Sequence, residues 1–218
     1  MKQGEPGIVA IFEELPAQYT QRAANLGFDF KKPVKDGKLK IMYIRPLDLS
    51  VDETVHEIVS AVKEIGCKRL VIDSLAGFEM ALAPAFRQDF RESLYRMIGA
   101  LTRLGVTIVS TVETIDDFTS LNFSNFTVSF LADDIVRLRY ISLNGQLRRM
   151  LMVVKMRRSA HSFDMKEYRI TKGGIDIGKP IRGFRSLTSG LPSPWSFASE
   201  ELPETFEEDL EQFGDGEK

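Results

Sequence analysis

The sequence predicts an α/β fold: a mostly parallel sheet flanked by helices, with a C-terminal antiparallel β meander. In the first half of the chain, short β-rich apolar runs alternate with segments of helical spacing. Parallel neighbours need crossover connections, so this alternation favours a parallel sheet with helices on both faces. In the second half, strand-like runs follow one another and join around Asn144-Gly145, a pair that favours tight hairpin turns.

Strands and helices are predicted in turn along the first half. The predicted strands are residues 7–12, 38–44, 69–73 and 107–113, each short and with β-branched residues. The first helix runs from Pro16, a residue suited to the first helical turn, to Gly27, suited to a left-handed cap. The second starts at a capping box of Ser50 and Glu53 and ends at Gly66.

The remaining elements are one helix and three strand-like runs. The helix covers residues 86–104, where apolar side chains recur at helical spacing. These side chains are Phe90, Leu94, Met97, Ile98 and Leu101. Strands are predicted over residues 134–143 and 147–156, and a third run around 168–177 extends the meander. Regular signals fade after Gly178.

Composition bounds the class of protein. With 218 residues, 43% of them hydrophobic, the chain is expected to form one domain over residues 1–180. Residues 181–218 form a C-terminal extension whose acidic end is predicted to be disordered. The net charge of −2 gives no overall attraction to nucleic acid, and the single cysteine, Cys67, excludes an internal disulfide. No apolar run approaches the roughly 20 residues of a membrane span, so we expect a cytoplasmic protein without membrane contact.

Acidic residues follow two of the predicted strands. Glu13 and Glu14 come after the first strand, and Asp73, followed by Ser74, ends the third. In open α/β sheets, ligands collect at the carboxyl edge of the strands, where these acids converge. One or two carboxylates are enough to hold hydrated Mg²⁺, and another can orient or deprotonate water. The structural alternative is that each acid belongs to a turn or a helix N-terminus.

A basic segment lies in the predicted meander. Seven Lys/Arg and no acid occur between Arg137 and Arg158, which suits either a solvent-facing ribbon or a nucleic-acid patch. Tyr140 is the only aromatic residue inside it, so a platform for stacking single-stranded bases is poorly supported. His161 has no neighbour at metal-binding spacing, and no zinc site is expected.

Taken in order, several blocks of the chain are similar to the KaiC-like branch of the RecA-type P-loop ATPases, the circadian clock protein KaiC family. They are GEPGIVAIFEELPAQ (4–18), LGFDF (26–30), DGKLKI (36–41), KRLVIDSLAG (68–77), AFRQDF (85–90), ADDIVRLRY (132–140) and VVKMRRSAH (153–161). AFRQ and IRGFRSLTSG (181–190) look more like the family's C-terminal ATPase half. The resemblance implies a RecA-like fold.

The resemblance also implies an ATP site and its residues. Glu13 and Glu14 are implied as the catalytic carboxylates, and Glu13 and Asp73, the Walker B acid, as the Mg²⁺ ligands. ATP and Mg²⁺ are the implied ligand and cofactor. The family forms hexameric rings with nucleotide between subunits, so a homo-oligomer is implied. The residues implied to reach a neighbour's nucleotide in trans are Arg149, Lys155, Met156, Arg157, Ser159 and His161.

Phosphorylation is a further implication of the resemblance. The Ser-Thr pair that the family's C-terminal half phosphorylates falls on Ser129 and Phe130. Ser129 is therefore a candidate for autokinase activity, but Phe130 cannot accept phosphate, which argues against a clock function.

The phosphate loop of this ATPase class, G-x-x-x-x-G-K-[ST], has one near match, GGIDIGKP at residues 173–180. Pro180 stands where the hydroxyl should be, and nothing helical follows, so we reject it. We therefore expect either an N-terminally incomplete ATPase domain that is inactive alone, or a non-catalytic regulatory or interaction module of the same fold. A nucleic-acid-binding recombinase paralogue is the third alternative, although nucleic acid is not the expected partner.

Overall fold

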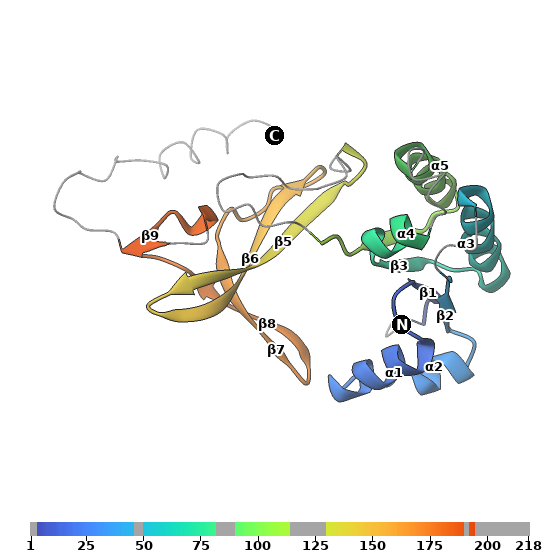
Figure 1. Ribbon diagram of the computed structural model, residues 1–218, viewed down its shortest axis with the longest axis horizontal. Coiled ribbons are helices and arrows are strands. Elements are labelled where there is room, and N and C mark those ends of the chain that lie inside the picture. The colour runs from blue at the N-terminus through green and yellow to red at the C-terminus, as the bar shows by residue number, and fades with distance from the viewer. Residues whose placement is uncertain (1–3, 46–49, 82–89, 114–129, 190–191, 195–218) are drawn as a thin grey trace, which may run out of the picture.

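The computed structural model describes residues 4–45, 50–81, 90–113, 130–189 and 192–194 (Figure 1). Its first half is built on a four-stranded parallel sheet with the order β2-β1-β3-β4. The strands are β1 (Gly7–Ile11), β2 (Leu39–Tyr43), β3 (Arg69–Asp73) and β4 (Thr107–Ser110). All four predicted strands are confirmed. β4 is shorter than predicted, because its partner β3 ends at Asp73 and the last paired residues are Ile72 and Ser110.

Helices cover both faces of the parallel sheet, as predicted. They are α1 (Pro16–Asn25), α2 (Lys31–Lys35), α3 (Val51–Ile65), α4 (Leu75–Ala81) and α5 (Phe90–Arg103). In Figure 1, α1 and α2 lie on one side of the sheet and α3, α4 and α5 on the other. Two apolar clusters match these layers: a large one including Ile58, Phe78 and Leu94, and a small one where Tyr19 and Phe30 pack near β1 and β2.

The helix ends follow the local sequence. The Ser50 side chain accepts a hydrogen bond of 3.3 Å from the Glu53 backbone N–H, and the Glu53 carboxylate accepts one of 2.7 Å from the Ser50 N–H. This is the predicted capping box, and Gly66 ends α3 in the left-handed conformation with φ of 62°. The sequence did not predict α2 or α4, which are each only one or two turns long.

The second half forms a separate four-stranded antiparallel sheet with the order β5-β6-β7-β8. The strands are β5 (Asp134–Leu143), β6 (Gln146–Met156), β7 (Lys166–Thr171) and β8 (Gly174–Pro180). The hairpin turn at Asn144-Gly145 is confirmed, with both residues at positive φ. The predicted extension of the meander around residues 168–177 is confirmed, but it consists of two strands and not one, since the chain turns at 172–173.

Regular structure also continues beyond the predicted limit. The strand β8 runs to Pro180, and a small two-stranded sheet of β9 (Phe184–Arg185) and β10 (Ser193–Pro194) follows, with the 3₁₀ helix η3 (Leu187–Ser189) between its strands. Apolar side chains of this segment, including Ile181, Phe184 and Leu187, pack on the antiparallel sheet. The tertiary contact explains why these short elements form without a strong local signal.

The two faces of the β5–β6 hairpin differ. Residues of β5 alternate along the strand, with Arg137, Arg139 and Ile141 buried on the inner face. Val136, Leu138 and Tyr140 point to the other face, which we call the outer face. Because Arg137 and Arg139 are only 8% and 6% exposed, the alternative of a solvent-facing basic ribbon is wrong for these two residues.

Candidate functional site

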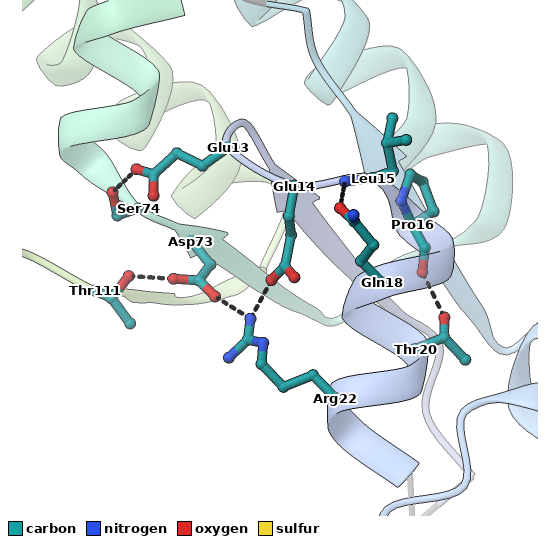
Figure 2. A network of polar contacts seen from close by, with 10 residues as sticks. All are labelled: Glu13, Glu14, Leu15, Pro16, Gln18, Thr20, Arg22, Asp73, Ser74 and Thr111. Atoms are coloured by element: carbon teal, nitrogen blue, oxygen red, sulfur yellow. Dashed lines mark hydrogen bonds and ion pairs between the residues drawn. The ribbon is translucent and has the colours of Figure 1, made fainter. Parts of the chain in front are cut away.

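Glu13, Glu14 and Asp73 lie at the carboxyl edge of the parallel sheet. Strands β1 and β3 are neighbours, and Ile11 pairs with Asp73 at their ends. The chain leaves β1 through Phe12, and the two glutamates follow before α1 begins at Pro16. Figure 2 shows the three carboxylates near the strand ends in two groups: Glu13 contacts Ser74, while Glu14 and Asp73 are joined by Arg22 of α1, with Thr111 on the other oxygen of Asp73.

Glu13 is held by the start of α4. The Ser74 hydroxyl donates a hydrogen bond of 3.0 Å to Glu13 Oε1 and accepts one of 3.0 Å from the Gly77 backbone N–H. At Gly77 an added Cβ would lie 2.9 Å from both Glu13 Oε1 and Phe12 Cβ. Only glycine allows α4 to pack this closely, so the sequence around Gly77 sets the position of the Glu13 carboxylate.

Asp73 and Glu14 share one cation. The Thr111 hydroxyl donates a hydrogen bond of 2.7 Å to Asp73 Oδ1. Arg22, from α1, donates a hydrogen bond to Glu14 Oε1, and its Nη2 lies 3.7 Å from Asp73 Oδ2. The guanidinium is also 4.9 Å from the centre of the Tyr19 ring, one helical turn earlier. One positive charge therefore stands between two carboxylates at the sheet edge.

The surroundings of this group shift two pKa values. The hydrogen bond to Glu14 raises the pKa of Arg22 further above its ordinary value, so the guanidinium stays charged. Burial raises the pKa of the Tyr19 phenol, and the negative charge of Asp73 raises it further, while Arg22 lowers it. The phenol is therefore neutral at physiological pH.

The second group of candidate residues lies at the end of β6. The Lys155 ammonium donates a hydrogen bond of 2.7 Å to the Ala132 carbonyl, and Arg157 donates one of 2.8 Å to the Phe130 carbonyl. Arg157 also lies 3.8 Å from Asp133. Both cations thus contact the segment that enters β5. No described contact joins either of them to Glu13, Glu14 or Asp73 within this chain.

A β-bulge separates Arg149 from Lys155. Lys155 pairs with Ile135 and Val153 pairs with Val136, so Val154 is an extra residue in β6. Adjacent residues of β5 point to opposite faces, which places Lys155 on the inner face and Arg149 on the outer face. Arg149 there donates a hydrogen bond of 3.4 Å to Tyr140, which raises the pKa of Arg149.

The remaining candidates follow β6. Met156 ends the strand and is half-buried, while Ser159 is exposed in the loop after it. The His161 ring is 4.7 Å from the ring of Phe163, which is 84% exposed. Ser129 lies outside the described residues. Residues 174–180 of the rejected loop form strand β8, a conformation unlike a phosphate loop.

Arg22 and Thr111 are site residues that the sequence did not identify. Arg22 is the only charged residue of α1, but a lone charge on a helix does not show which group it contacts. Thr111 lies in a run that was predicted as a continuing strand. The sequence feature that could have identified Arg22 is its place on the first helix after the acid pair, three residues after Tyr19 and therefore on the same side of that helix. Thr111 offered no such signal, because its role arises from the register of β3 and β4.

A parallel sheet covered by helices, with acids gathered at its carboxyl edge, places the chain in the α/β class, and a RecA-like fold is consistent with this arrangement. The family model of the KaiC ATPase matches residues 1–182, and the chain belongs to this family. Circadian clock protein KaiC3 of Synechocystis sp. is 29% identical over 189 residues, covering 87% of this chain and 37% of the relative. The circadian clock oscillator protein KaiC of Parathermosynechococcus lividus is 30% identical over 191 residues, covering 87% and 35%.

A solved structure has the same fold. The KaiC-like protein PH0186 from Pyrococcus horikoshii matches with a TM-score of 0.72 and 30% identity, over 82% of this chain and 77% of that one. The chain spans a little over a third of the length of the curated relatives it matches, at 37% of the first. In the described part of the chain, no helix has the length and apolarity needed to cross a membrane.

Proposed function

We propose that this chain supplies the hydrolytic residues of an ATP site that lies between subunits of a ring oligomer. The observation that carries the proposal is the convergence of Glu13, Glu14 and Asp73 at one edge of a KaiC-family domain. The 218 residues contain no G-x-x-x-x-G-K-[ST] segment, so the phosphate-binding amides of such a site must come from residues outside them.

The two glutamates take different parts in hydrolysis. Glu14 accepts a proton from the attacking water while the water oxygen bonds to the γ-phosphorus and the bond to the leaving ADP oxygen breaks. Glu13, held by the Ser74 hydroxyl at 3.0 Å, orients that water. The proton then passes to solvent, since Glu14 keeps a side-chain exposure of 27%.

The donor atoms at this edge suit Mg²⁺. Asp73 and Glu13 offer carboxylate oxygens, and the Thr111 hydroxyl bonds only the Oδ1 atom of Asp73. Within the described ranges no three acidic, His or Cys side chains form a ready metal cage. Mg²⁺ can keep several waters and bind one or two carboxylates. Mg²⁺ held by Glu13 and Asp73 would neutralise the charge of the β- and γ-phosphates.

Lys155 and Arg157 act on the nucleotide of a neighbouring subunit in this proposal. A cation supplied in trans stabilises charge that develops on the transferred phosphoryl group. Lys155 and Arg157 are held together near the start of β5 by the carbonyls of Ala132 and Phe130. Met156, Ser159 and His161 lie beside them in the chain, whereas Arg149 would contact the neighbour from the outer face of the hairpin.

Exposed apolar side chains support a contact between copies of the chain. The outer face of the β5–β6 hairpin carries Val136, Leu138 and Tyr140, each about half exposed, with Leu147 at 72%. A second copy of the chain would cover this surface in a ring. Sedimentation velocity of the complete gene product, with and without ATP, tests the assembly, and a single subunit's mass in both conditions would rule the ring out.

Turnover of the complete gene product tests the hydrolytic role. Glu14→Gln keeps the size of the side chain but cannot accept the proton, so kcat for ATP hydrolysis should fall by about 10² to 10⁴ with little change in KM. Glu57→Gln, an exposed glutamate on α3, is the matched control and should leave kcat unchanged. Equal kcat in the Glu14 variant and the wild type would refute the assignment.

Two alternatives remain open to direct measurement. A regulatory or interaction module of the same fold would keep its partners while the complete gene product neither binds labelled ATP nor hydrolyses it. A nucleic-acid-binding paralogue would bind DNA with an affinity that falls steeply with salt. Phosphorylation at Ser129 stays a prediction, and mass spectrometry after incubation with ATP would detect it.

A further inference from the structure

Arg22 is the one described cation that contacts two acids of the proposed site. Its guanidinium donates a hydrogen bond to Glu14 and lies 3.7 Å from Asp73, as Figure 2 shows. The carboxylates are largely covered, with side-chain exposures of 27% for Glu14 and 29% for Asp73. Two negative groups at such a place repel each other, so the positive charge between them stabilises their present arrangement.

The position of Arg22 conflicts with a bound metal ion. The Asp73 Oδ2 atom, which faces the guanidinium, is also the oxygen that Thr111 leaves available, since the Thr111 hydroxyl bonds Oδ1. A dication on this oxygen would stand within a few ångströms of the guanidinium. Two cations at that separation repel strongly in a partly desolvated site. Metal binding at Asp73 therefore requires the guanidinium to move away.

The exposure of the Arg22 side chain allows its guanidinium to move away from the carboxylates. Its side chain is 56% exposed, so the guanidinium can turn into water without losing a buried position. The Tyr19 ring, 4.9 Å away, offers an aromatic face against which the guanidinium already lies. An ion pair this exposed contributes little net free energy, so competition by a dication is feasible.

We propose that Arg22 is a built-in competitor of the divalent cation: it holds Glu14 and Asp73 in the metal-free protein and withdraws when the metal binds. Withdrawal releases the Glu14 carboxylate from its hydrogen bond at the same time. The acid that takes the proton from water thus becomes available only in the loaded site, which limits hydrolysis to nucleotide that arrives with its metal. The inference rests on the proposed function, because that function assigns the metal to Asp73.

Binding of Mn²⁺ alone to the 218-residue chain tests the competition without any turnover. Free Mn²⁺, measured by electron paramagnetic resonance at low ionic strength, gives the dissociation constant. Arg22→Gln should bind Mn²⁺ about two- to fivefold more tightly than the wild type, the factor that corresponds to an exposed ion pair. Arg22→Lys keeps the charge without the planar fork and should fall between the two.

Arg69→Gln is the matched control. It is the same substitution on β3, the strand of Asp73, but at the opposite end, where Arg69 pairs with Glu5 at 2.8 Å. This variant should bind Mn²⁺ as the wild type does. Equal tightening in both variants would mean a general effect of net charge and would overturn the proposal.

The Asp73→Asn substitution distinguishes a wrong assignment of the metal to Asp73 from a wrong role of Arg22. If this change abolishes Mn²⁺ binding in both backgrounds while Arg22→Gln binds no more tightly than the wild type, the metal site stands and the role of Arg22 is wrong. If Asp73→Asn changes nothing in either background, the metal does not bind at Asp73, and the metal assignment and the competition fail together. The hydrolytic role of Glu14 is tested independently by turnover.

Discussion

At the scale of single residues, the site depends on close packing as much as on charge. Gly77 lets α4 approach Phe12 and Glu13, and Phe78 then packs between Phe12 and Phe90, with ring centres 5.7 and 5.5 Å apart. The apolar core therefore reaches directly under the Glu13 carboxylate. A change in core packing at this point must displace a residue of the proposed hydrolytic site.

Gly77→Ala measures this dependence. The added methyl would lie 2.9 Å from Glu13 Oε1 and Phe12 Cβ, so we expect a loss of about 1–3 kcal/mol in the free energy of unfolding. Gly99→Ala on α5 is the control, because its new methyl would meet only Arg103 Nη1 at 3.7 Å. That change should stabilise by about 0.5–1 kcal/mol. Urea unfolding compares the two, and similar values would contradict the packing described for Gly77.

Residues of the site were predictable to different degrees. The acids could be predicted because Asp73 ends an apolar run and Glu13 and Glu14 directly follow one, and such runs are visible in the sequence. Arg22 and Thr111 could not, because each reaches Asp73 only through the packing of α1 and the pairing of β4 with β3. It could not be predicted either that Arg149 and Lys155 lie on opposite faces of the sheet, because a β-bulge has no reliable signature in a single sequence.

At the scale of elements, strong end signals gave correct boundaries. Helix α3 was predicted by its capping box and terminal glycine. Helix α4 has an N-cap in Ser74, whose hydroxyl accepts the Gly77 N–H, but it lacks a capping box and a terminal glycine, and its Phe78 is buried in the core. Likewise, β7 and β8 were merged in prediction because the turn of Lys172 and Gly173 lies inside an otherwise strand-like run. Elements that depend on tertiary contacts are those that the sequence missed.

The capping box of α3 predicts a measurable loss. Ser50→Ala removes the acceptor of the Glu53 N–H and should cost about 1 kcal/mol of unfolding free energy. Ser60→Ala, at an exposed position inside the same helix, should change stability by less than half as much. The hydrogen bond from the Ser50 backbone N–H lowers the pKa of the Glu53 carboxyl. The stabilisation that the Glu53 carboxylate provides is therefore present above the ordinary pKa of a glutamate and is lost as the pH falls below it. A Ser50 effect no larger than that of Ser60 would contradict the cap.

At the scale of the whole molecule, a thiol and two phenols with raised pKa values predict that stability falls in alkaline solution. Burial raises the pKa of the Cys67 thiol and of the Tyr19 and Tyr168 phenols. A raised pKa favours the protonated folded state, so these groups stabilise below their unfolded pKa values. The free energy of unfolding should fall as pH rises above about 8.5 for the thiol and about 10 for the phenols.

Urea unfolding between pH 7 and 10.5 follows this loss. Tyr19→Phe should make the decline above pH 10 shallower, because one partly buried phenol no longer ionises on unfolding. Tyr95→Phe, at a side chain that is 61% exposed, is the control and should follow the wild-type curve. Identical slopes for the Tyr19 variant and the wild type would show that burial of this phenol does not govern alkaline stability.

The extra residue in β6 has a consequence for length variation in this hairpin. Because Ile135 pairs with Lys155 and Val136 with Val153, removing Val154 would leave every other cross-strand partner unchanged. Val153 and Val154 are identical, so removing either one gives the same chain. Removing a residue nearer the turn would instead turn the side chains between the cut and the bulge to the other face. The hairpin can therefore lose one residue of the Val153-Val154 pair without turning any other side chain, and Lys155 would stay opposite Ile135 on the inner face.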